Sequence, residues 1–327
     1  MKNRLIISSS IIVQLTIILL LGFKIYHDKT QILGEMSISP ISKADIILTQ
    51  TENLKFFYEP KPGIIEDMND WVPYRGTNTI NADTLNERYD YSTSKDEKTY
   101  RVITLGDSFT YGLYVNTSEN WVERLEDLLN ERLSCKNISK FEIINLGVQG
   151  YDIQYAVERF RIRGIKYDPD LVMWFMVNDD IYQLNELLHE KDKQYHQEMM
   201  ESGEFQRLVD SGVYYPSWKK AETELRQQIS DEEFMDIQMR FLTAFNSLYQ
   251  GNLVLFMFPS MSDHLELFFM DYVSQRPNTY YFNSLSDIYS SEELFFANDN
   301  HPTSKGHAVI AEDLYKYLTE NNIVPCN

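Results

Sequence analysis

The residue best placed to carry out chemistry is Ser108, in the stretch RVITLGDSFTYG at 101–112. Residues 102–105 form a short apolar run that is typical of a buried strand, and Gly106 permits a tight turn directly after it. Ser108 is therefore predicted to be displayed at the carboxyl end of this strand. A plain strand-to-helix turn, in which Asp107 and Ser108 only cap the helix, has the same pattern, so a catalytic role needs partners elsewhere in the chain.

Such partners lie near the other end of the chain. Asp299 and His301 are two positions apart in the segment NDNHPTSKGH at 298–307, which an amphipathic helical pattern follows. A serine hydroxyl is a poor nucleophile at neutral pH and needs a base within hydrogen-bonding reach. His301 would supply that base and Asp299 would orient its imidazole. The three side chains would then catalyse acyl transfer through an acyl-enzyme on Ser108.

Two further segments could stabilise the negative charge that develops on the substrate oxygen during acyl transfer. NLGVQG at 145–150 and Asn178 each directly follow an apolar run that is typical of a strand. Residues just past the carboxyl ends of parallel strands converge on one crevice, which would bring both segments to Ser108. The backbone N–H groups of Ser108 and Gly150 and the side-chain amide of Asn178 are predicted to form an oxyanion hole.

Four segments of the chain resemble the four blocks of the SGNH (GDSL-type) hydrolase family. In sequence order, these segments are GDSFTYG, NLGVQG, VND and DNHPT. The resemblance covers roughly residues 101–318 and implies the site roles given above. It departs from the family in two places. Met176 occupies a position where the family has glycine, and one residue separates Asp299 from His301 where many members have two. Asn298 fills that other position and could also orient the imidazole, so the identity of the acidic partner stays open.

Other polar residues near these blocks are predicted to have structural roles. Asp107 would hydrogen-bond locally within its turn, and His307 would support the helix in which it lies. Asp179 and Asp180 are adjacent carboxylates with no histidine nearby, so we expect no metal ion and no cofactor. An α/β-hydrolase fold requires G-x-S-x-G, whereas Thr110 occupies the position of the second glycine.

Strand and helix patterns alternate from residue 101 onwards, which predicts parallel strands joined by helical crossovers. Strands are expected near 102–105, 142–145, 171–177, 253–258 and 280–282. One helix is expected to begin at Asn116, and two others are expected at 153–163 and 234–248. The predicted fold class is α/β, a three-layer αβα sandwich with a parallel, flavodoxin-like five-stranded sheet. The catalytic domain is expected to span residues 99–327.

One connection is longer than a helical crossover needs. Roughly residues 184–230, rich in Glu, Gln, Lys and Met, are predicted to form extra helices after the third strand. Because this insertion leaves from the carboxyl end of that strand, it starts beside the candidate site and could cover the substrate as a cap. An inert surface elaboration explains it equally well, since surface loops tolerate insertions.

Residues 1–26 are predicted to be a membrane anchor or an uncleaved signal. Residues 5–23 carry no charge, approach the ~20 residues that a helix needs to cross a bilayer, and are not followed by a small-x-small cleavage site. Lys2 and Arg4 favour a cytoplasmic amino end, which would place the catalytic domain outside the cytoplasm, in the periplasm or the extracellular space. Residues 27–98 are interpreted as a spacer or accessory segment, part of which is packed.

The composition limits the range of partners. The chain has 327 residues, of which 43% are hydrophobic, enough for one good-sized core. Its net charge of −19 argues against nucleic acids and anionic membrane surfaces, because the electrostatic contribution to binding would be repulsive. The expected substrate is an acyl ester of a glycan, a lipid or a small alcohol, and the enzyme would be an esterase or an O-acyltransferase. The alternative is a non-catalytic glycan-binding or interaction module that retains the fold.

The chain contains two cysteines, Cys135 and Cys326. In a flavodoxin-like sheet, the first and last helices pack on the same face, and their carboxyl ends share the edge opposite the site. Because each cysteine follows one of these two helices, the pair is predicted to be close and able to form a disulfide. Two unrelated cysteines are the alternative, since two cysteines carry no spacing signature.

Overall fold

The computed structural model of the chain describes residues 54–69, 72–257, 263–283, 292–297 and 299–326. The expected anchor at 1–26 and Asn298 lie outside these residues. Within the described ranges, no helix is both long enough and apolar enough to cross a membrane. The described residues divide into two compact units, a main unit within 54–189 and 229–326 and a helical unit at 190–228.

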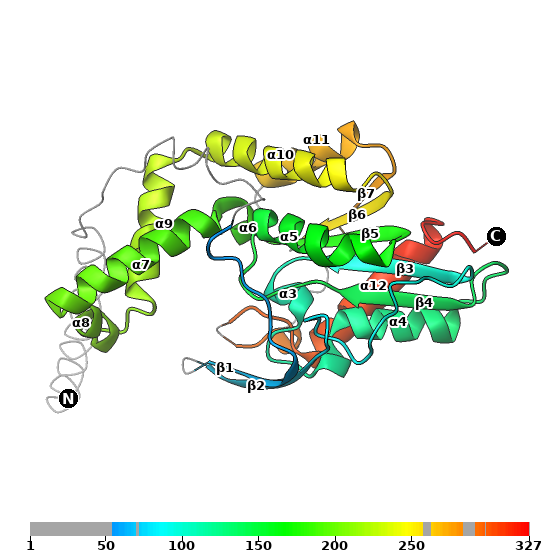
Figure 1. Cartoon of the computed structure of the whole chain (residues 1–327), viewed down its shortest axis with the longest axis horizontal. Helices are drawn as coiled ribbons and strands as arrows, with labels where there is room; N and C mark the ends of the chain where they lie inside the picture. Colours follow the sequence, from blue (N-terminus) through cyan, green and yellow to red (C-terminus); the bar gives the residue numbers. More distant parts are fainter. Residues whose placement is uncertain (1–53, 70–71, 258–262, 284–291, 298, 327) are drawn as a thin grey trace, which may run out of the picture. The chain divides into compact units, whose positions relative to one another are not determined.

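The main unit is built on a parallel sheet of five strands (Figure 1). The strands are β3 (Thr99–Leu105), β4 (Lys140–Asn145), β5 (Leu171–Met176), β6 (Asn252–Met257) and β7 (Thr279–Phe282). Their spatial order is β4-β3-β5-β6-β7, which is the flavodoxin-like order that the sequence predicts. Strand β3, which leads to Ser108, is therefore an interior strand and pairs with β4 and β5.

Helices cover both faces of this sheet (Figure 1). On one face, α4 (Trp121–Arg132) packs against α12 (Ser304–Glu320), and their apolar residues join the inward side of the strands in one core. On the other face lie α5 (Ile153–Arg159) and α10 (Asp231–Leu248). Adjacent residues of β5 serve the two faces, since Trp174 contacts Phe245 of α10 and Phe175 belongs to the core with α4 and α12.

Further helices and strands belong to the main unit. They are β1 (Gly63–Asn69), β2 (Val72–Ile80), α3 (Ser108–Tyr111), α6 (Asn178–Tyr182), the first residues of α7 (Asn185–Ser202), and α11 (Asp263–Gln275). The predicted helix start at Asn116 is off by one short turn. Asn116 and Glu119 form a capping box, but it begins a 3-10 turn, Thr117–Glu119, and α4 starts only after Asn120, whose side chain accepts the Val122 N–H at 2.8 Å.

The described part of the accessory segment, residues 54–98, packs within the main unit. Its β1 and β2 form an antiparallel hairpin. Glu59 forms ion pairs with Arg159 of α5 and with Arg163, the latter at 2.6 Å, and Arg159 also donates to the Thr84 carbonyl at 2.6 Å. These buried and half-buried charges join the accessory segment to the helix that follows β4.

The same segment contributes to a cluster of buried glutamates beside β4. Glu87, Glu123 and Glu126 are all almost completely buried, and Tyr91 donates its hydroxyl to Glu126 at 2.9 Å. Glu126 also accepts the Ile143 N–H at 2.7 Å. Burial raises the pKa of Glu126 to about 7 and that of Glu87 well above its usual range, so these carboxyls favour their protonated forms.

This cluster should make stability fall as the pH rises. A carboxyl whose folded pKa is raised contributes stability that is complete below its ordinary pKa and is lost as the pH passes through the folded value, here between about 4.5 and 7 for Glu126. Glu126→Gln keeps an acceptor but cannot ionise. We expect the fall in melting temperature between pH 5 and pH 8 to be smaller in this variant than in the wild type, as measured by circular dichroism. Glu131→Gln, an exposed change on the same helix, is the matched control and should leave the wild-type difference intact.

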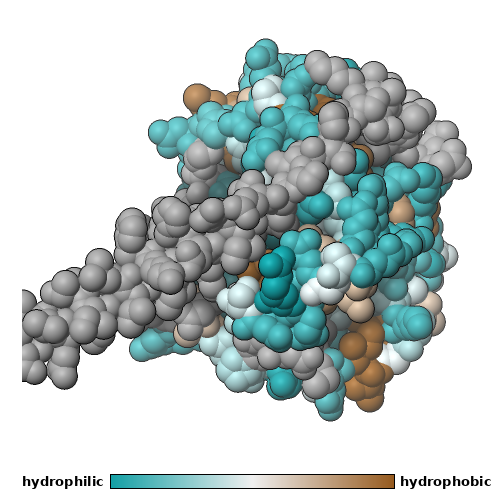
Figure 2. All heavy atoms as spheres, turned by 90° about the vertical axis from the view of Figure 1, so that its left-hand side faces the viewer, coloured by the Kyte–Doolittle hydropathy of each residue, from teal (hydrophilic) through white to brown (hydrophobic). Residues whose placement is uncertain are grey.

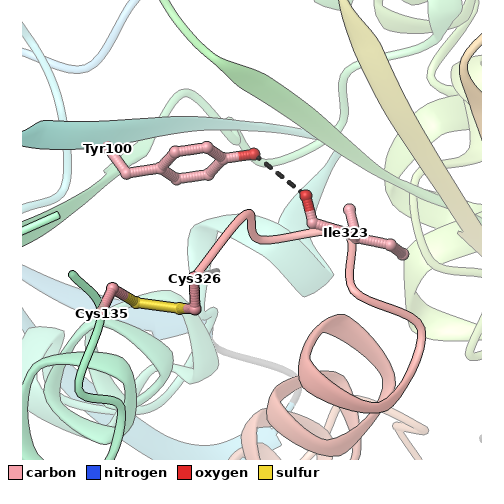
Figure 3. Close-up of a disulfide and its surroundings, with 4 residues drawn as sticks. All are labelled: Tyr100, Cys135, Ile323 and Cys326. Atoms are coloured by element: carbon pink, nitrogen blue, oxygen red, sulfur yellow. Dashed lines mark hydrogen bonds between the residues drawn. A yellow bond between two sulfur atoms is a disulfide. The ribbon is translucent and has the colours of Figure 1, made fainter. Parts of the chain in front are cut away.

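Cys135 and Cys326 form a disulfide, which confirms the predicted proximity of the two cysteines (Figure 3). Their Cα atoms are 4.4 Å apart, and both cysteines pack against the core between α4 and α12. Next to the bridge, the Tyr100 hydroxyl of β3 donates to the Ile323 carbonyl at 3.4 Å (Figure 3). The tail after α12 is thus attached both to the loop after α4 and to β3.

Removing this bridge should destabilise the protein without affecting the chemistry of the site. We expect the double variant Cys135→Ser, Cys326→Ser to lose about 2 to 4 kcal/mol of unfolding free energy, because an open chain gains conformational freedom when it unfolds. Chemical denaturation with and without dithiothreitol measures the loss. The reductant should destabilise the wild type and leave the double variant unchanged, and equal stability of the two proteins without reductant would contradict the expectation.

The helical unit comprises most of α7 together with α8 (Glu204–Asp210) and α9 (Pro216–Gln228). These helices lie in the segment for which the sequence predicts extra helices. Inside it, the Tyr195 hydroxyl hydrogen-bonds to Glu224, and the Lys220 ammonium lies 4.0 Å from the centre of the Tyr195 ring. Met199 and Leu208 form its apolar centre. Whether this unit covers the substrate stays a hypothesis.

The face of the protein shown in Figure 2 is mostly hydrophilic. Among the residues that the structure describes, the hydrophobic surface on this face forms small separate areas. That distribution is in keeping with the net charge of −19. Scattered exposed apolar side chains are normal for a protein surface and do not by themselves indicate a binding site.

Candidate active site

Ser108 is positioned by a turn that only glycine allows. Gly106 directly follows β3 with φ at 146°, and a Cβ atom there would lie 2.3 Å from Thr110 Oγ1 and 2.8 Å from the Phe175 carbonyl oxygen. Asp107 then caps α3 by accepting the Phe109 N–H at 2.9 Å, as predicted for a local role. Ser108 is consequently the first residue of α3, just past the carboxyl end of β3.

The structure brings Ser108, His301 and Asp299 together in one chain of hydrogen bonds. Ser108 Oγ lies 2.7 Å from His301 Nε2, and Asp299 Oδ1 contacts His301 Nδ1. Because the carboxylate accepts from Nδ1, the neutral imidazole presents a bare Nε2 to the serine hydroxyl. Burial acts to raise the pKa of Asp299, but the hydrogen bond from His301 and the positive charge of its protonated form outweigh burial and hold that pKa below its usual range.

Aromatic rings hold the imidazole in place. The Phe109 ring stacks on the His301 ring with centroids 4.8 Å apart, and Tyr114 meets it edge-on at 5.8 Å. On the loop that carries His301, the Phe296 N–H donates to the His301 carbonyl at 2.9 Å. The ring of Tyr74 in β2 packs against that of Phe296 in a tilted arrangement, with centroids 4.3 Å apart, so the accessory hairpin supports the loop that carries His301.

A pocket of about 270 Å³ opens over these groups. It is lined by Asp107, Ser108, Phe109, Val177, Asn178, Asp179, Asp299, Asn300 and His301. Asn178 is the first residue of α6, and the neighbouring Asp180 fixes this turn by accepting the Val177 N–H at 2.8 Å. Three of the predicted site segments, those of Ser108, Asn178 and His301, therefore meet at one pocket.

Gly150 lies on the loop after β4, which runs beside the serine turn. This loop extends the pairing of β3 and β4, because Leu146 N–H donates to Thr104 at 2.9 Å and Val148 N–H donates to Gly106 at 3.3 Å. Gly150 itself is exposed, with φ at 74°. It is not among the residues lining the pocket, so its N–H as an oxyanion donor stays a prediction.

His307 has the structural role that the sequence predicts. It is fully buried, and its Nδ1 accepts the N–H of Trp121, the first residue of α4, at 3.2 Å. Burial, followed by the positive charges of Arg124 and His301, lowers the pKa of His307 to about 3 and keeps the ring neutral. His307 therefore stabilises the contact between α4 and α12, and we assign it no role in the reaction.

One family model and several solved structures are similar to this chain. A family model described as GDSL-like lipase/acylhydrolase matches residues 102–314. Similar solved structures include the psychrotrophic esterase EstA from Pseudoalteromonas sp., at 17% identity over 69% of this chain and 98% of that chain, with a TM-score of 0.43.

Two others are a lipase/acylhydrolase from Enterococcus faecalis and a family 3 carbohydrate esterase from Clostridium thermocellum. The first has 12% identity over 68% of this chain and 96% of that chain, with a TM-score of 0.43. The second has 14% identity over 70% of this chain and 100% of that chain, with a TM-score of 0.41. A comparison with curated protein sequences gave no match.

Proposed function

Since the chain belongs to the GDSL-like lipase/acylhydrolase family, as its four sequence blocks predict, we propose that it is a serine esterase with Ser108 as nucleophile. The observation that carries this proposal is the 2.7 Å contact of Ser108 Oγ with His301 Nε2, with Asp299 on the other ring nitrogen. A non-catalytic module that retains the fold would be favoured if Asp299 failed to reach His301. Their contact supports the enzyme instead.

The reaction has two halves. His301 Nε2 takes the hydroxyl proton as Ser108 Oγ attacks the acyl carbon, and the tetrahedral intermediate collapses when the imidazolium returns that proton to the leaving alcohol. The acyl group is then bonded to Ser108. In the second half, His301 deprotonates an incoming hydroxyl, which attacks the acyl carbon, and Ser108 leaves with the proton. Asp299 keeps the tautomer and stabilises the imidazolium in both halves.

The negative charge on the substrate oxygen needs fixed donors. We assign this role to the N–H groups of Ser108 and Gly150 and to the Asn178 side chain. The placing of Asn178 at the pocket beside Ser108 supports its share in this role. The course of the 145–150 loop along the serine turn supports the share of Gly150.

The molecule that accepts the acyl group from Ser108 decides the activity. If water accepts it, the protein is an esterase, and if a sugar hydroxyl accepts it, the protein is an O-acyltransferase. A pocket of about 270 Å³ lies at the small end of ligand sites and favours short acyl groups such as acetyl. We therefore propose short acyl esters, borne by an envelope glycan or a lipid, as substrates. The Cys135–Cys326 disulfide supports an extracytoplasmic site, because such bridges persist mainly in oxidising compartments.

A fluorophosphonate probe and a series of p-nitrophenyl esters test this function. The probe should label the full-length protein at Ser108, identified by peptide mass spectrometry, and labelling should disappear in Ser108→Ala. Among the esters, hydrolysis of the acetate and butyrate should exceed that of the octanoate and laurate. Labelling elsewhere, or none at all, would remove the support for a serine esterase.

A further inference from the structure

The Gln149–Gly150 peptide receives a hydrogen bond from a distant part of the chain. The Tyr58 hydroxyl donates to the Gln149 carbonyl oxygen. That oxygen belongs to the same peptide unit as the Gly150 N–H, the backbone group assigned above to the oxyanion hole. In a trans peptide the C=O and N–H point in opposite directions, so whatever fixes the oxygen also fixes the direction of the N–H.

The next peptide is fixed as well. The buried Asn185 side-chain amide donates to the Gly150 carbonyl oxygen at 2.6 Å. Gly150 adopts φ of 74°, and a Cβ atom there would lie 3.0 Å from the Tyr58 hydroxyl oxygen. In the part of the chain that the structure describes, no protein acceptor receives the Gly150 N–H. Both carbonyls that flank this residue are held, and its donor is available to a ligand.

Tyr58 is itself well anchored. Its ring meets those of Tyr151 and Tyr155 edge-on, at centroid distances of 5.3 and 6.1 Å. The Tyr151 hydroxyl donates to the Tyr58 carbonyl, and the Glu186 carboxylate accepts the backbone N–H of Lys55 at 2.9 Å. The segment before Tyr58 is thus tied to the start of α7, and the phenol cannot move freely away from the loop.

Its chemical state suits a donor. Tyr58 keeps 37% of its surface exposed, but the loss of solvation of its hydroxyl, followed by the negative charges of Asp152 and Asp107, raises the pKa of that hydroxyl. The phenol therefore keeps its proton across the working pH range. A hydrogen bond accepted by a carbonyl also polarises the amide and strengthens its N–H as a donor.

We propose that Tyr58 is a positioning residue of the oxyanion hole, whose hydroxyl orients and polarises the Gln149–Gly150 peptide so that the Gly150 N–H is aimed at the substrate oxygen. This rests on the proposed function, in which that N–H stabilises the tetrahedral intermediate. Tyr58 lies outside residues 102–314, the part of the chain matched by the family model. The accessory segment is then part of the catalytic apparatus, and not only a spacer.

The test is Tyr58→Phe in the full-length chain, purified in a mild detergent, because phenylalanine keeps the ring contacts and removes only the donor. With p-nitrophenyl acetate, kcat should fall by about 10- to 100-fold while KM stays within about twofold, the pattern of an interaction made in the transition state. The inhibition constant of a trifluoromethyl ketone, which forms an oxyanion on Ser108, should rise by a similar factor. The pH profile set by the Ser–His–Asp chain should keep its shape.

Tyr249→Phe is the matched control. It removes a tyrosine hydroxyl that likewise donates to a backbone carbonyl, that of Asn252 at 3.1 Å, at the start of β6 and therefore at the opposite edge of the sheet. It should leave kcat and the inhibition constant unchanged.

Three outcomes would overturn the proposal. They are a Tyr58→Phe enzyme with wild-type kcat, a change confined to KM, and an equal loss of kcat in Tyr249→Phe. Each can occur while the wild type hydrolyses esters and Ser108→Ala does not, so the proposed function would survive. A wild-type chain that does not react with esters or with the fluorophosphonate would instead overturn the proposed function itself.

Discussion

Replacing either Ser108 or His301 by alanine is expected to lower kcat for ester hydrolysis by about 10³-fold or more, because nucleophile and base act as one unit. The double variant should be little worse than either single variant, since removing one member already stops the proton transfer that the other depends on. Hydrolysis of p-nitrophenyl acetate measures the rates. Circular dichroism should show unchanged folding, because both side chains line an open pocket and neither fills the core.

The matched control for these two variants is a histidine outside the site. His196→Ala removes a histidine from the helical unit and should leave the rate within about twofold of wild type. If either site variant kept more than about a tenth of the wild-type rate, the assigned triad would be wrong. Asp299→Asn should be less damaging than His301→Ala if Asn298, which lies outside the described residues, shares the orienting role.

The second large effect is expected for Asn178→Ala. Losing one oxyanion donor typically costs about 10²- to 10³-fold in kcat, and KM should change little because the donor acts mainly on the transition state. Steady-state kinetics on p-nitrophenyl acetate separate the two constants. The pocket position of Asn178, at the amino end of α6, is the reason for choosing it over other polar residues of the loop.

Asn321→Ala is the control for this change. Asn321 donates its side-chain amide to the Tyr317 carbonyl at 2.9 Å at the end of α12, which lies at the opposite edge of the sheet from the pocket. A kinetic effect equal to that of Asn178→Ala would mean that the site responds to general loosening of the fold. A change in KM alone would make Asn178 a substrate-binding residue.

Much of the sheet could be predicted because its strands are buried on both faces. Runs such as 171–177 are continuously apolar in the sequence and completely buried in the structure, so their burial leaves a direct signal. The two cysteines could be predicted to lie close together for a different reason, the order of the strands. Once the strand order is known, the ends of α4 and α12 have to meet, and the two cysteines follow those ends.

Helix α11 was not predicted, although its buried residues have helical spacing. Leu265, Phe269 and Tyr272 face inward, but Leu267 and Met270 are exposed by 66% and 48%, so apolar residues appear on both sides of the helix. The periodic signal is blurred where the outer face is not polar.

The aromatic residues around the site were missed for a different reason. Phe109 and Tyr114 contact His301 only because the chain brings the two ends of the catalytic domain together, and no spacing in the sequence encodes such a contact. Tyr114 also adopts a positive φ of 67°, which is uncommon outside glycine and has no sequence signature here. Tyr58 and Tyr74 come from a segment without a recognisable motif, so their place at the site could be learned only from the fold.

The Cys135–Cys326 bridge closes a covalent ring that contains four of the five strands of the sheet, both His301 and Asp299, and the whole helical unit. Ser108 lies on the arm that enters this ring. A protease that cuts the exposed turn at Gly203 or Gly212 therefore opens the ring without dividing the molecule, and the nucleophile and its base stay on one covalent body. Where the disulfide stays oxidised, backbone cleavage in the insertion would therefore yield two fragments that remain covalently joined through Cys135 and Cys326.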